Sequence, residues 1–144
     1  MQLKMFKKII LITFIFIIST ACFAQDFYVY KVKRVIDGDT LELETTNESP
    51  LIKKLGLHVR ISNIDTPEKT SKCKKEKQLA AQARKFVEDL TLNKEILLIN
   101  AKWDKYARIN AIVNYDGIII GDELIKRNLA VPYFGEKKQK NWCN

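Results

Sequence analysis

This sequence of 144 residues has a single histidine, His58, and only three cysteines, which lie far apart. No two cysteines stand at the short spacing of zinc-ligand pairs, so the sequence argues against a zinc site. An EF-hand is excluded as well, because the run after Asp39 lacks the third acid and the glycine that its loop requires. Internal repeats, low-complexity tracts and interdomain linkers are also missing, and the length is that of one domain.

A long apolar run is missing too, since the N-terminal apolar stretch, residues 9–18, is too short for a comfortable membrane span. Lysines precede it and small residues follow it, a pattern typical of a signal peptide. We expect cleavage after Ala24 (signal peptide, residues 1–24), export of the protein, and one mature domain, residues 25–144. Two alternatives are an uncleaved N-terminal anchor and a lipid-modified Cys22, although Ser19 stands where a large aliphatic residue is usual before such a cysteine.

Positive charge is what the mature chain has in excess. Loss of the signal peptide reduces the 25 basic residues by three to 22, against 17 acidic residues, which leaves a net charge of +5. This balance favours an anionic partner, either nucleic acid or an anionic surface. Two cysteines remain, Cys73 and Cys143, and an even count in an exported chain predicts a disulfide that would tether the C-terminal tail. The alternative is two unpaired thiols.

The rest of the sequence alternates between short strand-like and helical segments. Strands are predicted, from β-branched and aromatic residues and from alternation, over residues 27–36, 40–46, 57–64, 94–101, 107–115 and 118–120. Helices are predicted over residues 73–90 and 122–127, the second ended by Asn128, and a loop over residues 47–56. Strands this short and this closely spaced favour a small closed barrel over an open sheet.

Acidic residues mark the ends of two predicted strands. Asp37 and Asp39 flank a glycine between the first and second strands, and Asp-Gly tolerates positive φ and commonly forms a turn. Asp65 closes the third strand. If the second and third strands are antiparallel neighbours, Asp39 and Asp65 lie at one end of the sheet, where two carboxylates, a backbone carbonyl and waters suit Ca²⁺. Arg60 and Arg108 lie on strands that could flank the same end, and guanidinium groups match phosphate oxygens.

Three sequence blocks occur in an order and strand context that resemble a known family. They are IDGDT at residues 36–40, RISNIDTPE at residues 60–68 and DKYAR at residues 104–108, with weaker support from NLAVPYF at residues 128–134. Together they resemble the staphylococcal nuclease family over about residues 32–134. The resemblance implies an α+β, mainly β fold, an OB-fold five-stranded barrel with two to three helices. It also implies a monomeric, Ca²⁺-dependent nuclease that hydrolyses phosphodiester bonds in DNA and RNA.

The resemblance implies a role for each matching residue. Asp39 and Asp65 resemble the calcium carboxylates, and Thr66 the backbone carbonyl ligand. Asp37 resembles an acid that lies behind the metal ligands, and Glu68 the carboxylate that positions or activates the attacking water. The remaining matches are phosphate or base contacts: Arg60 and Arg108 on the scissile phosphate, Lys105 and Tyr106 on a neighbouring phosphate, and either Tyr133 or Phe134 stacked on a base.

The sequence departs from the family pattern around Arg108. The usual block KYGR is KYAR here, and Ile109 replaces a second glycine, so the local turn and the reach of Arg108 are in question. Trp142 is expected to pack against the domain and His58 to be a plain strand surface residue, which argues against a histidine base. One alternative is an OB-fold module that binds nucleic acid without cleaving it. Another is an exported structural protein stabilised by calcium.

Overall fold

The computed structural model describes residues 27–45, 50–138 and 140–144. The predicted signal peptide, residues 1–24, and the alternative lipid site at Cys22 lie outside the described residues. Within the described ranges, no helix combines the length and the apolar character needed to cross a membrane.

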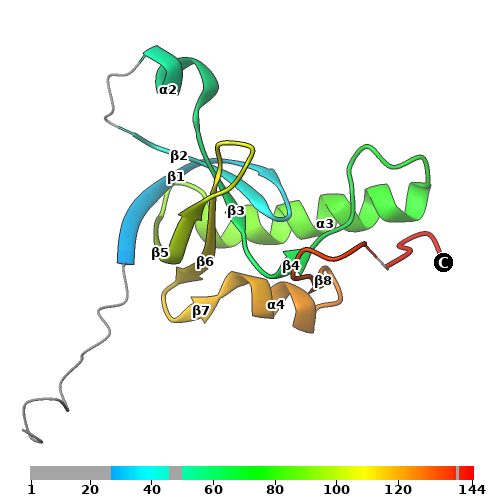
Figure 1. The fold of residues 1–144 in the computed structure, drawn as a ribbon. Coiled ribbons are helices and arrows are strands. Elements are labelled where there is room, and N and C mark those ends of the chain that lie inside the picture. Colours follow the sequence, from blue (N-terminus) through cyan, green and yellow to red (C-terminus); the bar gives the residue numbers. More distant parts are fainter. Residues whose placement is uncertain (1–26, 46–49, 139) are drawn as a thin grey trace, which may run out of the picture.

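Five strands close into a barrel, as the sequence predicted (Figure 1). Their spatial order is β3 (Leu57–Ile61), β2 (Thr40–Leu43), β1 (Phe27–Asp37), β5 (Glu95–Trp103) and β6 (Ile109–Tyr115). Neighbours pair antiparallel, and a parallel pairing of β3 with β6 closes the barrel. The short strand β7 (Ile118–Ile119) returns along β6. The chain therefore has the mainly β, OB-type architecture that the resemblance implied.

The core follows from the alternation along the strands. In β3, Leu57, Val59 and Ile61 are buried, whereas His58 and Arg60 between them are partly exposed on the other face. Fully buried side chains from the other four strands complete the interior: Val32, Val35, Leu41, Leu43, Ile96, Leu98 and Val113. Burial of this apolar surface is the main stabilising contribution to the barrel.

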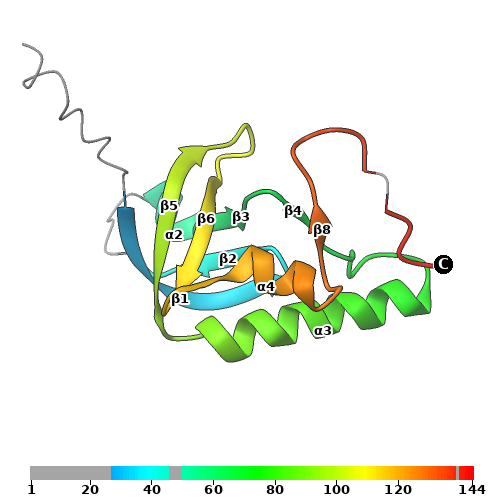
Figure 2. The same ribbon diagram turned by 90° about the horizontal axis from the view of Figure 1, so that it is seen from below.

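Two helices pack outside the barrel, α3 (Lys74–Thr91) and α4 (Ile120–Lys126). Figure 2 shows α3 lying along the barrel beside β1. Gly38 allows the close approach of α3, because a Cβ on Gly38 would lie 2.8 Å from the Cβ of Ala83 and 3.3 Å from Thr66 Cγ2. The turn between β1 and β2 was predicted from the tolerance of Asp-Gly for positive φ. That reason was wrong, since Gly38 does not have a positive φ and is required by packing.

The predicted loop of residues 47–56 contains a short helix, α2 (Pro50–Leu55). The segment was assigned as a loop because of its Asn, Ser, Pro and Gly, and this composition concealed the helix. The local signals were nevertheless present: Pro50 at the first helical position and Gly56, with φ of 78°, directly after the last one.

The predicted strand of residues 57–64 is two strands. β3 ends at Ile61, a turn follows at Ser62 and Asn63, with φ of 63° at Asn63, and the chain then enters β4 (Ile64–Asp65). β4 pairs with β8 (Val131–Pro132), a strand that was not predicted. Asp65 therefore lies on a separate two-stranded ribbon and does not close β3 as predicted.

Candidate functional site

Asp39, directly before β2, has partners for both of its carboxylate oxygens. β2 and β3 are antiparallel neighbours, and Thr40 pairs with Arg60 across them. The Asp39 residue is 7% exposed. Its Oδ1 accepts a hydrogen bond from Thr40 Oγ1 at 2.9 Å, and its Oδ2 accepts one from Thr66 Oγ1 at 3.1 Å. Oδ2 also lies 2.5 Å from Arg60 Nη1 in an ion pair.

Arg60 is fixed by both ends of its guanidinium fork. Nη1 pairs with Asp39, and Nη2 donates a hydrogen bond to the backbone carbonyl of Ile64 at 3.0 Å. The Arg60 side chain keeps 20% of its surface exposed. A guanidinium has five N–H donors, so donors remain for an oxyanion that approaches from solvent.

Asp65 and Glu68 share a cation that sequence reasoning missed, Lys138. Lys138 Nζ lies 2.7 Å from Asp65 Oδ1 and 2.8 Å from Glu68 Oε1. Burial alone would lower the pKa of Lys138, but its close contacts with Asp65 and Glu68 and the negative charges of these two acids outweigh burial and raise the pKa above its usual value. The sequence held no signal for this contact, because Lys138 is one of several lysines in a polar tail.

The contacts of Asp39 and those of Asp65 are linked through the chain, because Asp65 and Thr66 are consecutive residues. Thr66 donates its hydroxyl to Asp39, while Asp65 faces Lys138 and Glu68. The structure thus brings together five of the predicted site residues: Asp39, Arg60, Asp65, Thr66 and Glu68. Asp37 stands apart from their contacts, since its ionic partner is Lys69 at 2.9 Å.

Arg108 belongs to a separate cluster, the β5–β6 turn. Asp104 accepts hydrogen bonds from the backbone N–H groups of Tyr106 (2.8 Å) and Arg108 (3.0 Å), and from Arg108 Nε at 2.9 Å. Burial would raise the pKa of Asp104, but these hydrogen bonds and the Arg108 charge lower it overall. Asp104 was not singled out from the sequence, although it begins the DKYAR block. The two predicted phosphate arginines therefore have different carboxylate partners in the structure.

The aromatic candidates occupy different positions. The Tyr106 ring has Lys105 Nζ 5.1 Å and the Arg108 guanidinium 5.2 Å from its centre, so the predicted phosphate contacts are neighbours. Tyr133 lines a cavity of about 390 Å³ together with Asp65 and Lys138. Phe134 lines another cavity, of about 490 Å³, and is 71% exposed. Of the two residues that the sequence left open, Tyr133 is the one beside the acids.

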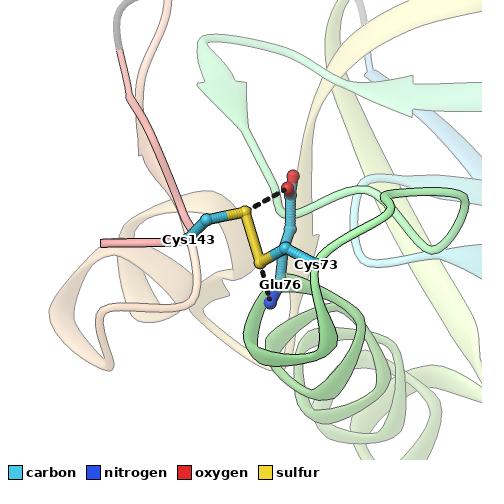
Figure 3. Close-up of side chains that lie close together, drawn as sticks. All are labelled: Cys73, Glu76 and Cys143. Atoms are coloured by element: carbon cyan, nitrogen blue, oxygen red, sulfur yellow. Dashed lines mark hydrogen bonds between the residues drawn. A yellow bond between two sulfur atoms is a disulfide. The ribbon is translucent and has the colours of Figure 1, made fainter.

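A disulfide between Cys73 and Cys143 connects the tail to the start of α3 (Figure 3). Cys73 caps the helix, since its Sγ accepts a hydrogen bond from the Glu76 N–H at 3.3 Å. Glu76 Oε2 lies 3.6 Å from Cys143 Sγ, and Glu76 Oε1 accepts the backbone N–H of Glu68 at 3.0 Å. Glu76 thus connects the disulfide to the segment that carries Glu68.

The donor atoms at Asp39 and Asp65 suit a hard cation. They are carboxylate oxygens with a threonine beside them, and Asp65 Oδ1 is buried without a hydrogen bond of regular geometry. Among the described residues, Asp39, Asp65 and Glu68 do not form a three-carboxylate cluster within reach of one ion. Carboxylate and carbonyl oxygens are the donors that Ca²⁺ prefers, so the chemistry of Asp39, Asp65 and Thr66 suits such an ion.

Comparisons with known proteins relate the chain to the staphylococcal nuclease family and to proteins named as endonucleases. Residues 58–142 match a family model described as staphylococcal nuclease homologue, a range that includes Arg60 to Glu68, Arg108 and Lys138. A Haemophilus influenzae protein named as an uncharacterized endonuclease is 29% identical over 129 residues, which are 88% of this chain and 65% of that protein. A probable endonuclease of Schizosaccharomyces pombe is 35% identical over 86 residues, 55% of this chain and 37% of that protein. The chain thus spans less than two thirds of the length of either relative.

Proposed function

Because the chain belongs to the staphylococcal nuclease family, we propose that it is a Ca²⁺-dependent nuclease that hydrolyses phosphodiester bonds in DNA and RNA. One observation supports this most strongly. A buried acid paired with an arginine, Asp39 with Arg60, is joined through Thr66 to the acids of a second segment, Asp65 and Glu68. An oxygen-ligand site beside a guanidinium suits a divalent cation and a phosphate together.

In this proposal each residue of the site has one role in the reaction. Asp39, Asp65 and the Thr66 carbonyl would hold Ca²⁺, which when bound polarises a phosphoryl oxygen. Glu68 accepts or orients the proton of the attacking water. The water oxygen forms a bond to phosphorus, and the bond from phosphorus to the leaving ester oxygen breaks, with the leaving oxygen taking the electron pair and then a proton from solvent. Arg60 donates to the equatorial oxygens as negative charge gathers there, an effect in which one fixed donor is worth about 3–4 kcal/mol.

Arg108 serves the same phosphate in this proposal. Its carboxylate partner Asp104 orients the guanidinium and keeps the turn closed. Lys105 and Tyr106, which precede it in the turn, hold the neighbouring phosphate, and Tyr133 stacks on a base beside the acids. Asp37 influences the metal ligands through the turn that it shares with Asp39.

We also propose export of the protein, with residues 1–24 as a signal peptide and residues 25–144 as the mature domain. The disulfide between Cys73 and Cys143 supports this, because such bonds persist in oxidising compartments. N-terminal sequencing of the exported protein is the test. A first residue other than Gln25 would move the cleavage site, and an intact N-terminus on membrane-bound protein would favour the anchor.

The function is tested by incubating the exported protein with plasmid DNA, single-stranded DNA and RNA, with Ca²⁺ and with excess chelator. Cleavage should require Ca²⁺. Asp39→Ala and Asp65→Ala should abolish it while the circular dichroism spectrum stays that of the wild type. Full activity in chelator would refute the metal assignment. Binding without cleavage under all conditions would favour the OB-fold binding module.

A further inference from the structure

Lys138 contacts the two acids that serve the cation and the attacking water, yet the proposed mechanism gives it no task. We propose that Lys138 is a tethered counter-cation of the site. It holds Asp65 and Glu68 in the Ca²⁺-free protein and leaves Asp65 when Ca²⁺ binds, so it weakens the Ca²⁺ affinity of the free protein. The inference rests on the proposed function and names a residue that tunes its cation site.

The burial of Asp65 explains why a counter-cation is needed. The Asp65 side chain is 5% exposed, against 58% for Glu68 and 47% for Lys138. A carboxylate removed from water is destabilised unless charge or hydrogen bonds compensate it. Asp39 obtains both kinds of compensation from Arg60 and two threonines, whereas Asp65 Oδ1 has the Lys138 ammonium beside it and no regular hydrogen bond.

Ca²⁺ and the ammonium group compete for the same carboxylate. Ca²⁺ takes carboxylate oxygens at about 2.3–2.6 Å, and Lys138 Nζ already lies 2.7 Å from Asp65 Oδ1. Two cations on one buried carboxylate repel each other strongly. Binding of Ca²⁺ to Asp65 therefore breaks an existing ion pair, and the free energy of that pair is subtracted from the binding free energy.

The tail that carries Lys138 is anchored on both sides of it. Before Lys138, β8 pairs with β4, and the Tyr133 N–H donates to the Asn63 carbonyl at 3.0 Å. After it, Trp142 is buried with 6% exposure and Cys143 is bonded to Cys73. Figure 2 shows the tail arching away from β8 and returning to the N-terminal end of α3. Such anchoring keeps the ammonium at a high effective concentration beside the acids.

The first experiment measures Ca²⁺ affinity by isothermal titration calorimetry, without nucleic acid, for the wild type, Lys138→Met and Lys137→Met. Methionine keeps the length of the side chain and removes the charge. Lys138→Met should bind Ca²⁺ about tenfold more tightly, an effect between those of exposed and buried ion pairs. Lys137→Met removes the same charge one residue away, and its affinity should stay within about twofold of the wild type.

The second experiment removes the tether with Cys73→Ser and Cys143→Ser together, and compares the effect of Lys138→Met with and without the disulfide. Opening the tether should itself tighten Ca²⁺ binding, and Lys138→Met should then add little. Thermal unfolding in chelator verifies that each variant is folded. If the disulfide-free protein does not fold, the comparison of Lys138→Met with Lys137→Met in the intact protein decides alone.

The outcomes separate the two proposals. No Ca²⁺ binding by the wild type would overturn the proposed function and this inference with it. Ca²⁺ binding by the wild type with an unchanged or weaker affinity in Lys138→Met would overturn the inference alone. Equal tightening in Lys138→Met and Lys137→Met would also overturn it, because the effect would then be one of net charge.

Discussion

Ala107 holds a backbone conformation that a residue with a side chain adopts at a cost. Its φ is 57°, in the left-handed region, within the turn that Asp104 closes by accepting two backbone N–H groups. For a non-glycine residue this region costs about 1–2 kcal/mol. The family block that this turn resembles has glycine at the position, so the departure noted in the sequence leaves the turn in place and adds strain to it.

Ala107→Gly should therefore stabilise the protein. Relief of the left-handed strain exceeds the extra entropy that glycine gives the unfolded chain, for a net gain of about 0.5–1 kcal/mol in the free energy of unfolding. Denaturant titration measures it. The matched control is Ala81→Gly on the exposed face of α3, which should lose about 0.5–1 kcal/mol. A loss of stability in both variants would show that Ala107 is not strained.

Glu68→Gln should reduce turnover far more than affinity for nucleic acid. The change removes a base and leaves the positive surface intact, so the rate at saturating substrate and Ca²⁺ should fall by about 10²-fold or more. Kinetics with a labelled oligonucleotide measure both quantities. Glu95→Gln, the same change at an exposed residue of β5, should leave both unchanged. If Glu68→Gln weakens binding and keeps its turnover per complex, Glu68 is not the base.

At the residue scale, the sequence predicted a set of acids and arginines for the site, and the structure brings Asp39, Arg60, Asp65 and Glu68 of that set together, but the sequence did not predict their partners. The partners follow from rotamers and from chain segments distant in sequence, such as Lys138 beside Asp65, 73 positions earlier. Lysines occur throughout the surface, so no local pattern marks the one that folds back onto the acids. Asp104 is different, because an acid four residues before an arginine on a tight turn is a readable signal.

Among the elements, the small ribbon of β4 and β8 matters most for the site. Two residues per strand are too few for an alternation to be seen, so the sequence suggested one longer strand instead. Pairing with β8 turns Asp65 away from β3 and places it beside the C-terminal tail. By contrast, the long alternating strands and α3 were predicted to within a few residues, because their burial patterns extend over several periods.

Gly38→Ala tests how closely α3 packs on the turn that carries Asp39. The new methyl group would stand 2.8 Å from the Ala83 Cβ, so helix or turn must shift, at a cost of about 1–3 kcal/mol in stability. Chemical denaturation measures the cost. Adding Ala83→Gly removes the clash, so Gly38→Ala should cost markedly less in that background. Equal costs in both backgrounds would mean that the contact with Ala83 does not explain the glycine.

For the whole molecule, closure of the barrel was predictable because short, closely spaced strands leave few other solutions. The barrel also contains a buried acid with two basic partners, which the sequence did not reveal. Glu42 of β2 is 6% exposed and pairs with Lys33 and Arg34, each at 2.7 Å. Hydrogen bonding to Lys33 lowers the pKa of Glu42 most, against the opposing effect of burial, and the contacts of Arg34 lower it further.

This pair of contacts should make the fold sensitive to acid. Because the folded-state pKa of Glu42 is below its ordinary value of 4.5, the stabilisation is fully present above that value and is lost as the pH falls through the folded-state pKa. Glu42→Gln should lose about 1–2 kcal/mol at pH 7, a value reduced from that of buried hydrogen bonds to a charged group because Lys33 and Arg34 are largely exposed. Denaturant unfolding at pH 7 and at pH 3 should show a smaller difference for Glu42→Gln than for the wild type. An equal difference would assign the acid sensitivity to other carboxylates.

The two tryptophans differ so much in exposure that they give the protein an optical signal for the state of its tail. Trp103, at the end of β5, is 65% exposed, whereas Trp142 is 6% exposed and directly precedes Cys143. In Trp103→Phe the remaining emission should be blue-shifted and resistant to iodide. Reduction of the disulfide should shift it to the red, make it accessible to iodide and relieve quenching by the adjacent sulfur bond. An emission spectrum that stays unchanged on reduction would show that Trp142 holds the tail in place without the covalent bond.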